Sequence, residues 1–190
     1  MKSILQSIKP LHCENIAIGI KKYELRKTKP NIPTPFKVHI YETKDKKFIN
    51  MAVYEPNNNI KFEHAPGKVI AEYICDEIIE WTEDMKPPVP LSELGLSYRQ
   101  IREYGGDKPL YLWHISDLKI YDKPKELREF IKPCDKDVIC TNCNYAREDL
   151  TVSEAVDWIL SNHSLKSAIC INKLTHPPQS WCYVEEVPNE

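Results

Sequence analysis

The chain has 190 residues, of which 42% are hydrophobic and 28% are charged. A chain of this length is expected to form one domain with a sizeable core, and its apolar fraction excludes a disordered protein. No run approaches the ~20 consecutive apolar residues that cross a bilayer, and the first residues lack the pattern of a secretory signal. We therefore expect a soluble cytoplasmic protein with no membrane partner.

Charge is distributed unevenly, although the formal net charge is only −2. Residues 1–47 carry eleven Lys or Arg against four acidic residues, so that the rest of the chain is acidic as a group. A basic quarter on an acidic body predicts one face that meets an anion, commonly phosphate. The alternative is a solvated strand face whose charges are balanced by acids elsewhere in the fold.

A helix and a strand are predicted close together near the N-terminus. Pro10 fits the first turn of a helix, and Gly19 is suited to its C-terminal end. Residues 23–26 then alternate between apolar and charged side chains, as a half-buried strand does. In such a strand Glu24 and Arg26 point to the same face.

Short strands dominate the rest of the first 125 residues. Residues 36–41 alternate like a second half-buried strand, and 67–81 is the most apolar stretch and is expected to be the central strand. A short helix is predicted at 97–104, ended by Gly105 and Gly106. Further strands are predicted at 3–8, 110–115, 118–121 and 181–184, with a weak hairpin around 48–53.

Many short strands without βαβ alternation predict an α+β protein built on a small β-barrel with a few short helices. Residues 132–175 differ from the rest, because they hold four of the seven Cys and a capping box that predicts a helix over 152–161. We therefore expect a barrel formed by residues 1–131 and 176–190. Residues 132–175 would be a Cys-containing, partly helical insertion.

One octet, residues 19–26, fits the pattern G-x-K-x-x-E-x-R. A turn would present Lys21, and the following strand would carry Glu24 and Arg26 side by side. An ammonium, a carboxylate and a guanidinium around one point can hold a phosphate or another polar ligand, with the guanidinium as a bidentate fork. Alternatively, the octet is a row of surface salt bridges on a strand.

This octet and the order of the elements around it resemble the ASCH domain of the PUA-like superfamily, in particular its bacterial and phage members. That family is a small β-barrel with one or two helices, and the same motif lines its cleft. The resemblance covers roughly residues 2–125 and 176–187. Its other supporting segments are residues 8–10, 36–43, 67–76, 110–116 and 177–181.

The resemblance implies recognition of RNA or a nucleotide in the cleft. Trp113 would stack on a base or pack in the core, since strand alternation sends it and His114 to opposite faces and at most one of them lines the cleft. The residues expected to bind nucleic acid are Lys9, Lys21, Lys22, Glu24, Arg26, Lys27 and Trp113, with Lys29 also at the rim.

Some members of the family hydrolyse an acylated cytidine, and at least one cleaves single-stranded RNA. The amidohydrolases use a Thr nucleophile activated by the motif Lys, with a Glu from a later strand. In this sequence Glu24 stands at the Thr position, whereas Lys21 is retained and Glu72 can match the later acid. A carboxylate cannot replace that alkoxide, so slow or absent hydrolysis of acyl-cytidine is expected. If the protein is an enzyme, the candidate catalytic residues are Lys21, Glu24 and Glu72.

Four cysteines of the insertion form a candidate zinc site, with His163 as an alternative fourth ligand. A C-x2-C pair supplies two thiolates from one turn, and a tetrahedral site needs two further ligands. Such a zinc ion would be structural, and no other cofactor is expected. The alternative is a set of unrelated free thiols. The candidate ligands are Cys134, Cys140, Cys143 and Cys170.

Three functions from different classes therefore remain. The first is binding of RNA or a nucleotide in the cleft around the octet. The second is a hydrolase acting on RNA or on a modified nucleoside, and the third is a module that uses the barrel to hold a protein partner. Turnover separates the second function from the others.

Overall fold

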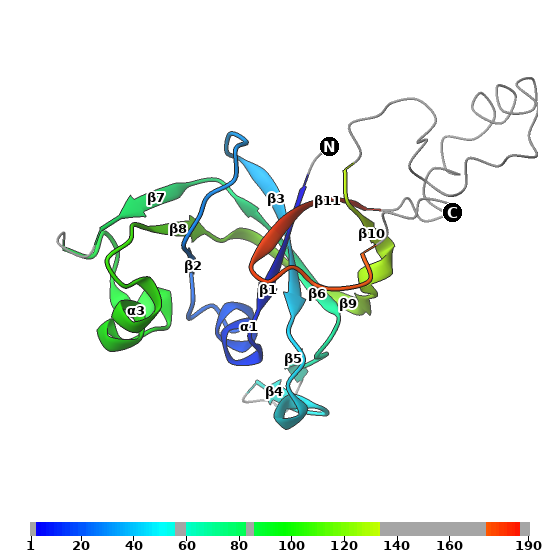
Figure 1. Cartoon of the computed structure of the whole chain (residues 1–190). Helices are drawn as coiled ribbons and strands as arrows, with labels where there is room; N and C mark the ends of the chain where they lie inside the picture. The colour runs from blue at the N-terminus through cyan, green and yellow to red at the C-terminus, as the bar shows by residue number, and fades with distance from the viewer. Residues whose placement is uncertain (1–2, 56–59, 83–85, 134–173, 187–190) are drawn as a thin grey trace, which may run out of the picture.

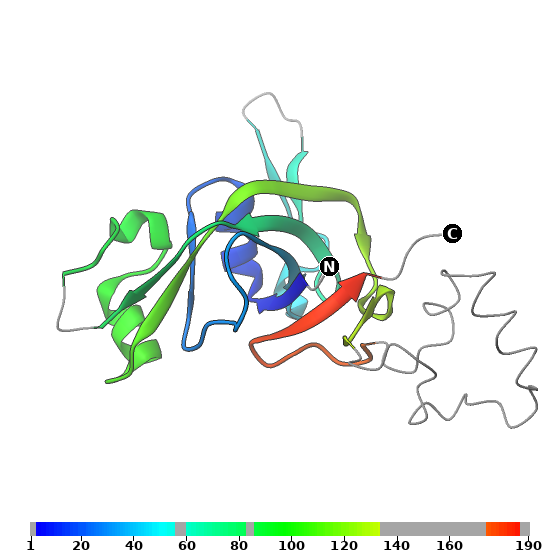
Figure 2. The ribbon, with the colours of Figure 1, turned by 90° about the horizontal axis from the view of Figure 1, so that it is seen from above.

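The computed structural model describes residues 3–55, 60–82, 86–133 and 174–186. Its largest element is a six-stranded mixed sheet, in the order β10-β11-β1-β3-β6-β9, which curls into half of a barrel (Figures 1 and 2). Neighbouring strands are antiparallel except β1 and β3, which pair in parallel. The strands are β1 (Ser3–Ile8), β3 (Phe36–Glu42), β6 (Val69–Cys75), β9 (Ser116–Lys125), β10 (Phe130–Ile131) and β11 (Trp181–Glu186).

A second, three-stranded sheet in the order β2-β8-β7 lies beside the first, and a separate hairpin pairs β4 with β5. Strand β2 of the three-stranded sheet lies between the helices α1 and α3 (Figures 1 and 2). The remaining strands are β2 (Tyr23–Arg26), β4 (Ala52–Tyr54), β5 (Ile60–Glu63), β7 (Ile78–Trp81) and β8 (Leu110–His114). The helices are α1 (Pro10–Ala17), α2 (Leu91–Leu94) and α3 (Tyr98–Gly105), with short 3₁₀ turns η1 (Lys46–Phe48) and η2 (Leu127–Glu129).

Both helices predicted within the first 125 residues form. The predicted end signals hold for α1, whereas α3 begins at a capping box that was not predicted. Pro10 occupies the first turn of α1, and Gly19 follows its end with a φ of 81°, a conformation that glycine adopts without strain. Ser97 caps α3 by accepting a hydrogen bond from the backbone N–H of Gln100 in a complete capping box. These caps fix where each helix begins and ends.

Strands β1 and β3 of the large sheet are buried on both faces. Along β1, Ile4 belongs to a core cluster with Val38, whereas its neighbour Leu5 belongs to a second cluster with Tyr41 and Phe130. The prediction that residues 36–41 form a half-buried strand is therefore wrong. The reason is that segments from the end of the chain, around β10 and β11, cover the second face.

The prediction of one central strand over 67–81 is also wrong. The apolar run is divided at Asp76 and Glu77 into β6, an inner strand of the large sheet, and β7, an edge strand of the small sheet. Likewise β8 belongs to the small sheet and does not continue the large one. An apolar run predicts burial in either sheet equally well, so hydropathy does not reveal the division.

The predicted helix over 152–161 and most of the insertion at 132–175 lie outside the described residues. At its boundary, the backbone N–H of Leu174 donates a hydrogen bond of 2.8 Å to the carbonyl oxygen of Phe130. Among the helices in the described ranges, none is both long and apolar enough to cross a membrane.

Candidate nucleotide-binding site

The three charged residues of the octet lie together at β2. Glu24 Oε1 is 3.1 Å from Arg26 Nη2, and Glu24 Oε2 is 3.3 Å from Lys21 Nζ. Glu24 and Arg26 share a face because they are two residues apart in a strand, and the turn after Gly19 brings Lys21 to the same place. We call Lys21, Glu24 and Arg26 the β2 cluster.

The β2 cluster is buried, so it is not a row of surface salt bridges. The exposed fractions are 2% for Lys21, 7% for Glu24 and 6% for Arg26. Charged side chains are almost never buried to this extent unless they are paired. Two cations surround one carboxylate here, so the cluster keeps one positive charge in excess.

Both cations also donate hydrogen bonds to the surrounding backbone. Lys21 Nζ donates to the carbonyl oxygen of Leu94 at 2.7 Å, which ties α2 to β2. Arg26 donates through Nη2 to the carbonyl oxygen of Ser7 at 2.8 Å and through Nη1 to the carbonyl oxygen of Ser180 at 3.3 Å. The guanidinium therefore joins the end of β1 to the loop before β11, and the cluster also stabilises the fold.

Some polar atoms of the site have no hydrogen-bond partner among the described residues. Arg26 Nε and His12 Nδ1 are buried and unpartnered, and Glu24 Oε2 contacts Lys21 outside the geometry of a hydrogen bond. A buried donor without an acceptor costs about 1–3 kcal/mol. These atoms therefore favour a ligand or water that completes their hydrogen bonds.

The electrostatics keep Glu24 ionised. Burial alone raises the pKa of the Glu24 carboxyl, but the charges of Lys21 and Arg26 outweigh it and hold the pKa below its usual range. A carboxylate held in this way is a weak base. A catalytic role for Glu24 as a base, one of the candidate roles if the protein is an enzyme, thus has little support in this environment.

His12 is a site residue that the sequence analysis missed. It lies on α1, and burial lowers its pKa; the nearby Glu24 carboxylate opposes this shift, and the positive charges of Lys21 and Lys9 reinforce it. The imidazole is therefore neutral near pH 7. The sequence did contain a signal for His12 as a site residue, because it lies in the helix that directly precedes the octet.

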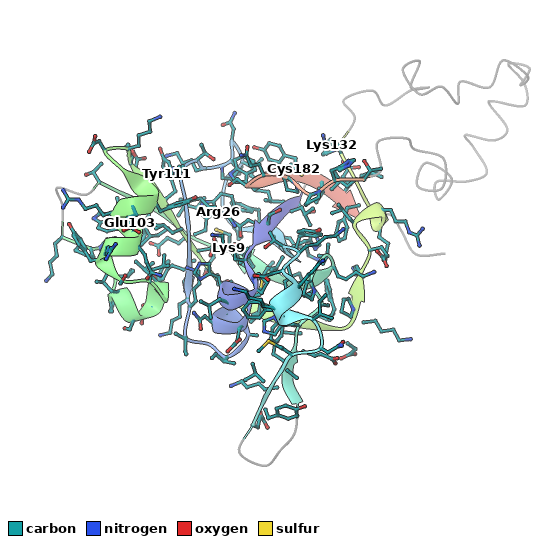
Figure 3. The ribbon with its side chains drawn as sticks, turned by 60° about the horizontal axis from the view of Figure 1, so that its bottom comes forward. Lys9, Arg26, Glu103, Tyr111, Lys132 and Cys182 are labelled. Carbon is teal, nitrogen blue, oxygen red and sulfur yellow. The ribbon has the colours of Figure 1, made fainter. Side chains whose placement is uncertain are left out.

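The predicted rim lysines are exposed, and they differ in their contacts. Lys22 pairs with Glu93 at 2.9 Å, and Lys27 Nζ lies 4.8 Å from the centroid of the Tyr104 ring. Lys9, labelled in Figure 3, is the N-cap of α1, and its charge acts on His12 as those of Lys21 and Arg26 do. Lys9 and Lys27 are therefore the two rim cations without a carboxylate partner in the described part of the chain.

Two predicted site residues are not part of this cluster. Glu72 lies on β6, where its Oε2 accepts hydrogen bonds from Lys37 Nζ at 3.1 Å and from Tyr121 Oη at 2.9 Å. Neither partner contacts the β2 cluster. Trp113 has an exposed fraction of 0% and packs edge-on against Phe36. Its ring offers no free face to a base, so the core-packing alternative fits.

A second, largely buried cluster of charged residues links α1 to the end of β3. His64 Nδ1 is 2.5 Å from Glu42 Oε1, and His64 Nε2 is 3.3 Å from Glu14 Oε2. The remaining oxygen of Glu42 accepts a hydrogen bond from the backbone N–H of Ala65 at 2.7 Å. We call Glu14, Glu42 and His64 the β3 cluster, because Glu42 ends that strand.

The predicted zinc ligands Cys134, Cys140, Cys143 and Cys170 lie outside the described residues. Within the described ranges, no three His, Cys, Asp or Glu side chains are arranged to hold a metal ion. Cys13, Cys75 and Cys182 are free thiols there. Burial raises the pKa of each, to about 12 for Cys75.

No protein-family model matches the sequence, and neither does any curated protein. Solved structures of an ASCH protein from Zymomonas mobilis are similar to the chain. One has a TM-score of 0.52 at 17% identity and covers 96% of this chain and 87% of that chain. Two single-substitution variants have TM-scores of 0.54 and 0.51 at 17% and 16% identity, covering 97% and 96% of this chain and 91% and 88% of theirs.

The chain therefore has the fold of an ASCH domain. This finding confirms the fold that the resemblance implied, a small α+β barrel of the PUA-like kind with few helices.

Proposed function

We propose that the protein binds RNA or a nucleotide at the β2 cluster. The observation that carries the proposal is the buried excess of one positive charge, together with the Nε of Arg26, which has no hydrogen-bond partner among the described residues. A bound phosphate would balance the excess positive charge, and one of its oxygens would accept a hydrogen bond from Arg26 Nε.

The exposed cations near the cluster support this proposal. Lys9 and Lys27 carry charges that no carboxylate in the described ranges neutralises. Lys9 is the N-cap of α1, and Lys27 directly follows Arg26 at the end of β2. Surface lysines attract a polyanion at long range and are screened by salt. The buried cluster would then hold one phosphate, and the rim would attract its neighbours along a strand.

The test measures RNA binding against salt concentration, using a fluorescent single-stranded oligonucleotide, its DNA counterpart and a mononucleotide as separate probes. About four neutralised phosphates give a log–log slope near −3 for single strands. The double variant Lys9→Ala/Lys27→Ala removes two cations without touching the core, and it should flatten the slope by about 1.4.

The matched control is Lys46→Ala/Lys47→Ala, which removes the same charge from the exposed turn η1. It should change the slope by much less than the rim variant. Binding that is independent of salt, equal effects of the two double variants, or no binding of any probe would contradict the proposal. The last result would favour the module that holds a protein partner.

Cleavage of RNA is the second candidate function, and the neutral imidazole of His12 beside Lys21 favours it. A neutral imidazole can take the proton of a ribose 2′-hydroxyl as that oxygen attacks the adjacent phosphorus. A 2′,3′-cyclic phosphate forms as the bond from phosphorus to the 5′-oxygen breaks. The 5′-oxygen takes a proton from water, to which the imidazolium later returns its own, while Lys21 stabilises the charge on the phosphorus oxygens.

Turnover of single-stranded RNA and of acylated cytidine by the wild type and His12→Gln tests this second function. Cleavage of RNA that is lost in His12→Gln supports it, and slow or absent hydrolysis of acylated cytidine is expected from Glu24. Binding without turnover of either substrate would exclude the second function and leave RNA or nucleotide binding as the function.

A further inference from the structure

Tyr111 lies next to Arg26 on the face of the small sheet that carries the β2 cluster. In the register of the sheet, Arg26 on β2 is opposite Tyr111 on β8, which is itself opposite Glu80 on β7. Directly opposed residues of antiparallel strands have Cβ atoms about 4.5–5.5 Å apart and lie on one face. In the view of Figure 3, Arg26 lies between Tyr111 and Lys9.

We propose that the Tyr111 ring stacks on a base of the nucleic acid or nucleotide whose phosphate binds at Arg26. This inference rests on the function proposed above, and it assigns the recognition of the base to a residue outside the octet. The inference also restricts the ligand to one with an accessible base. A single strand or a free nucleotide has such a base, whereas a duplex does not.

Strand alternation explains why Tyr111 takes the role that the sequence suggested for Trp113. The two residues are two positions apart on β8 and therefore share a face. Trp113 is opposite Glu24 and is fully buried. Tyr111 is opposite Arg26 and is partly exposed. An aromatic ring can stack on a base only where one of its faces can be uncovered.

Lys29 makes that uncovering possible. Its Nζ lies 5.3 Å from the centroid of the Tyr111 ring and 3.3 Å from Glu80 Oε2. Lys29 and Glu80 are both more than half exposed, and an exposed ion pair of this kind is weak. A base can therefore displace the ammonium from the ring, and the freed ammonium can pair with the phosphate of the incoming nucleotide.

The test compares two single-stranded probes with the same number of phosphates, oligouridine and an abasic oligonucleotide. The wild type should bind oligouridine about tenfold more tightly, because stacking on one aromatic ring is sequence-tolerant but needs a base. Tyr111→Leu should remove this preference and leave the affinity for the abasic probe unchanged. Tyr111→Phe, which keeps the ring and its packing, should retain the preference.

Tyr98→Leu is the matched control. Tyr98 is 43% exposed on α3, which packs against the opposite face of the small sheet through Ile101. It should leave the preference intact. A preference that survives in Tyr111→Leu, or that is lost equally in Tyr98→Leu, would overturn the inference while the binding function stands. If the wild type binds neither probe, the proposed function itself fails.

Discussion

Two buried clusters of charged residues border α1, and they differ in how completely their hydrogen bonds are made. In the β3 cluster both oxygens of Glu42 have donors, and both ring nitrogens of His64 face carboxylates. In the β2 cluster, and in His12 beside it, buried atoms have no hydrogen-bond partner within the part of the chain that the structure describes. A completed cluster needs nothing from outside, whereas an incomplete one with surplus charge favours a ligand.

The charge balance of the two clusters is also reversed. The β3 cluster places two carboxylates around one imidazole, and the β2 cluster places two cations around one carboxylate. The comparison therefore predicts that changes in the β3 cluster alter stability alone, whereas changes in the β2 cluster alter stability and anion binding together.

The largest effect is expected for Glu42→Leu. The substitution removes the acceptor of His64 and of the Ala65 N–H in a fully buried position, and breaking such a network costs about 3–5 kcal/mol. Urea unfolding measures the loss, with Lys46→Ala as an exposed control. The folded variant should bind oligouridine like the wild type, and a loss below about 1 kcal/mol would show that the network contributes little.

Glu24→Gln sharpens the comparison because its two effects have opposite signs. Removing the carboxylate charge leaves two buried cations and should cost about 1–3 kcal/mol of stability. The same change doubles the surplus positive charge, so the affinity for single-stranded RNA should rise, whereas Glu42→Gln should leave it unchanged. An affinity that falls in Glu24→Gln would mean that the carboxylate itself contacts the ligand.

The pH dependence of stability should identify Glu24 separately. Its pKa is lower in the folded protein than its ordinary value of 4.5, so the unfolded chain takes up the proton first as the pH falls. The stabilisation is therefore complete above about pH 4.5 and is lost as the pH falls through the folded pKa. The stability difference between wild type and Glu24→Gln should shrink over this range, and a constant difference would contradict the assignment.

A smaller effect is expected for the pH dependence of RNA binding. Burial keeps the pKa of His12 below its ordinary value of 6.5 in the free protein, and a bound phosphate would raise it. Binding then takes up a proton, so the affinity should increase severalfold as the pH falls below about 6.5. The charged groups that act on this imidazole are Glu24, Lys21, Lys9 and Arg26. The increase should be absent in His12→Gln.

The smallest effect concerns neither cluster. Ser97→Ala removes the N-cap of α3 and should cost about 1 kcal/mol in urea unfolding. The affinity for RNA should not change, because the cap is at the exposed end of the helix. A change in affinity would mean that α3 positions the binding site, which neither cluster would explain.

The sequence predicted those parts of the site that depend on neighbours along the chain. Pro10 and Gly19 bound α1, and the spacing of Glu24 and Arg26 puts them on one face of β2, because capping and strand alternation act over a few residues. The close approach of Lys21, Glu24 and Arg26 was predictable for the same reason, because all three lie within six residues of one another.

Features that depend on distant contacts were not predictable in this way. The partner of Arg26 at Ser180 is 154 residues away, and the cover over β3 comes from β10 and β11. Whether Trp113 or Tyr111 is accessible depends on how the two sheets pack, since alternation gives both residues the same face. Periodicity specifies the face of a strand, and tertiary packing decides which residues on that face reach the surface.

The hydrogen bond between Leu174 and Phe130 also bears on how this barrel tolerates changes in length. Leu174, the first described residue after residues 134–173, is bonded to Phe130 in β10, so the barrel itself holds these two points of the chain together. The entropy of closing a loop grows only with the logarithm of its length, by about 0.6 kcal/mol for each doubling. This junction is therefore a place where segments of very different size can be exchanged by recombination, or a foreign peptide inserted by design, at little thermodynamic cost to the barrel.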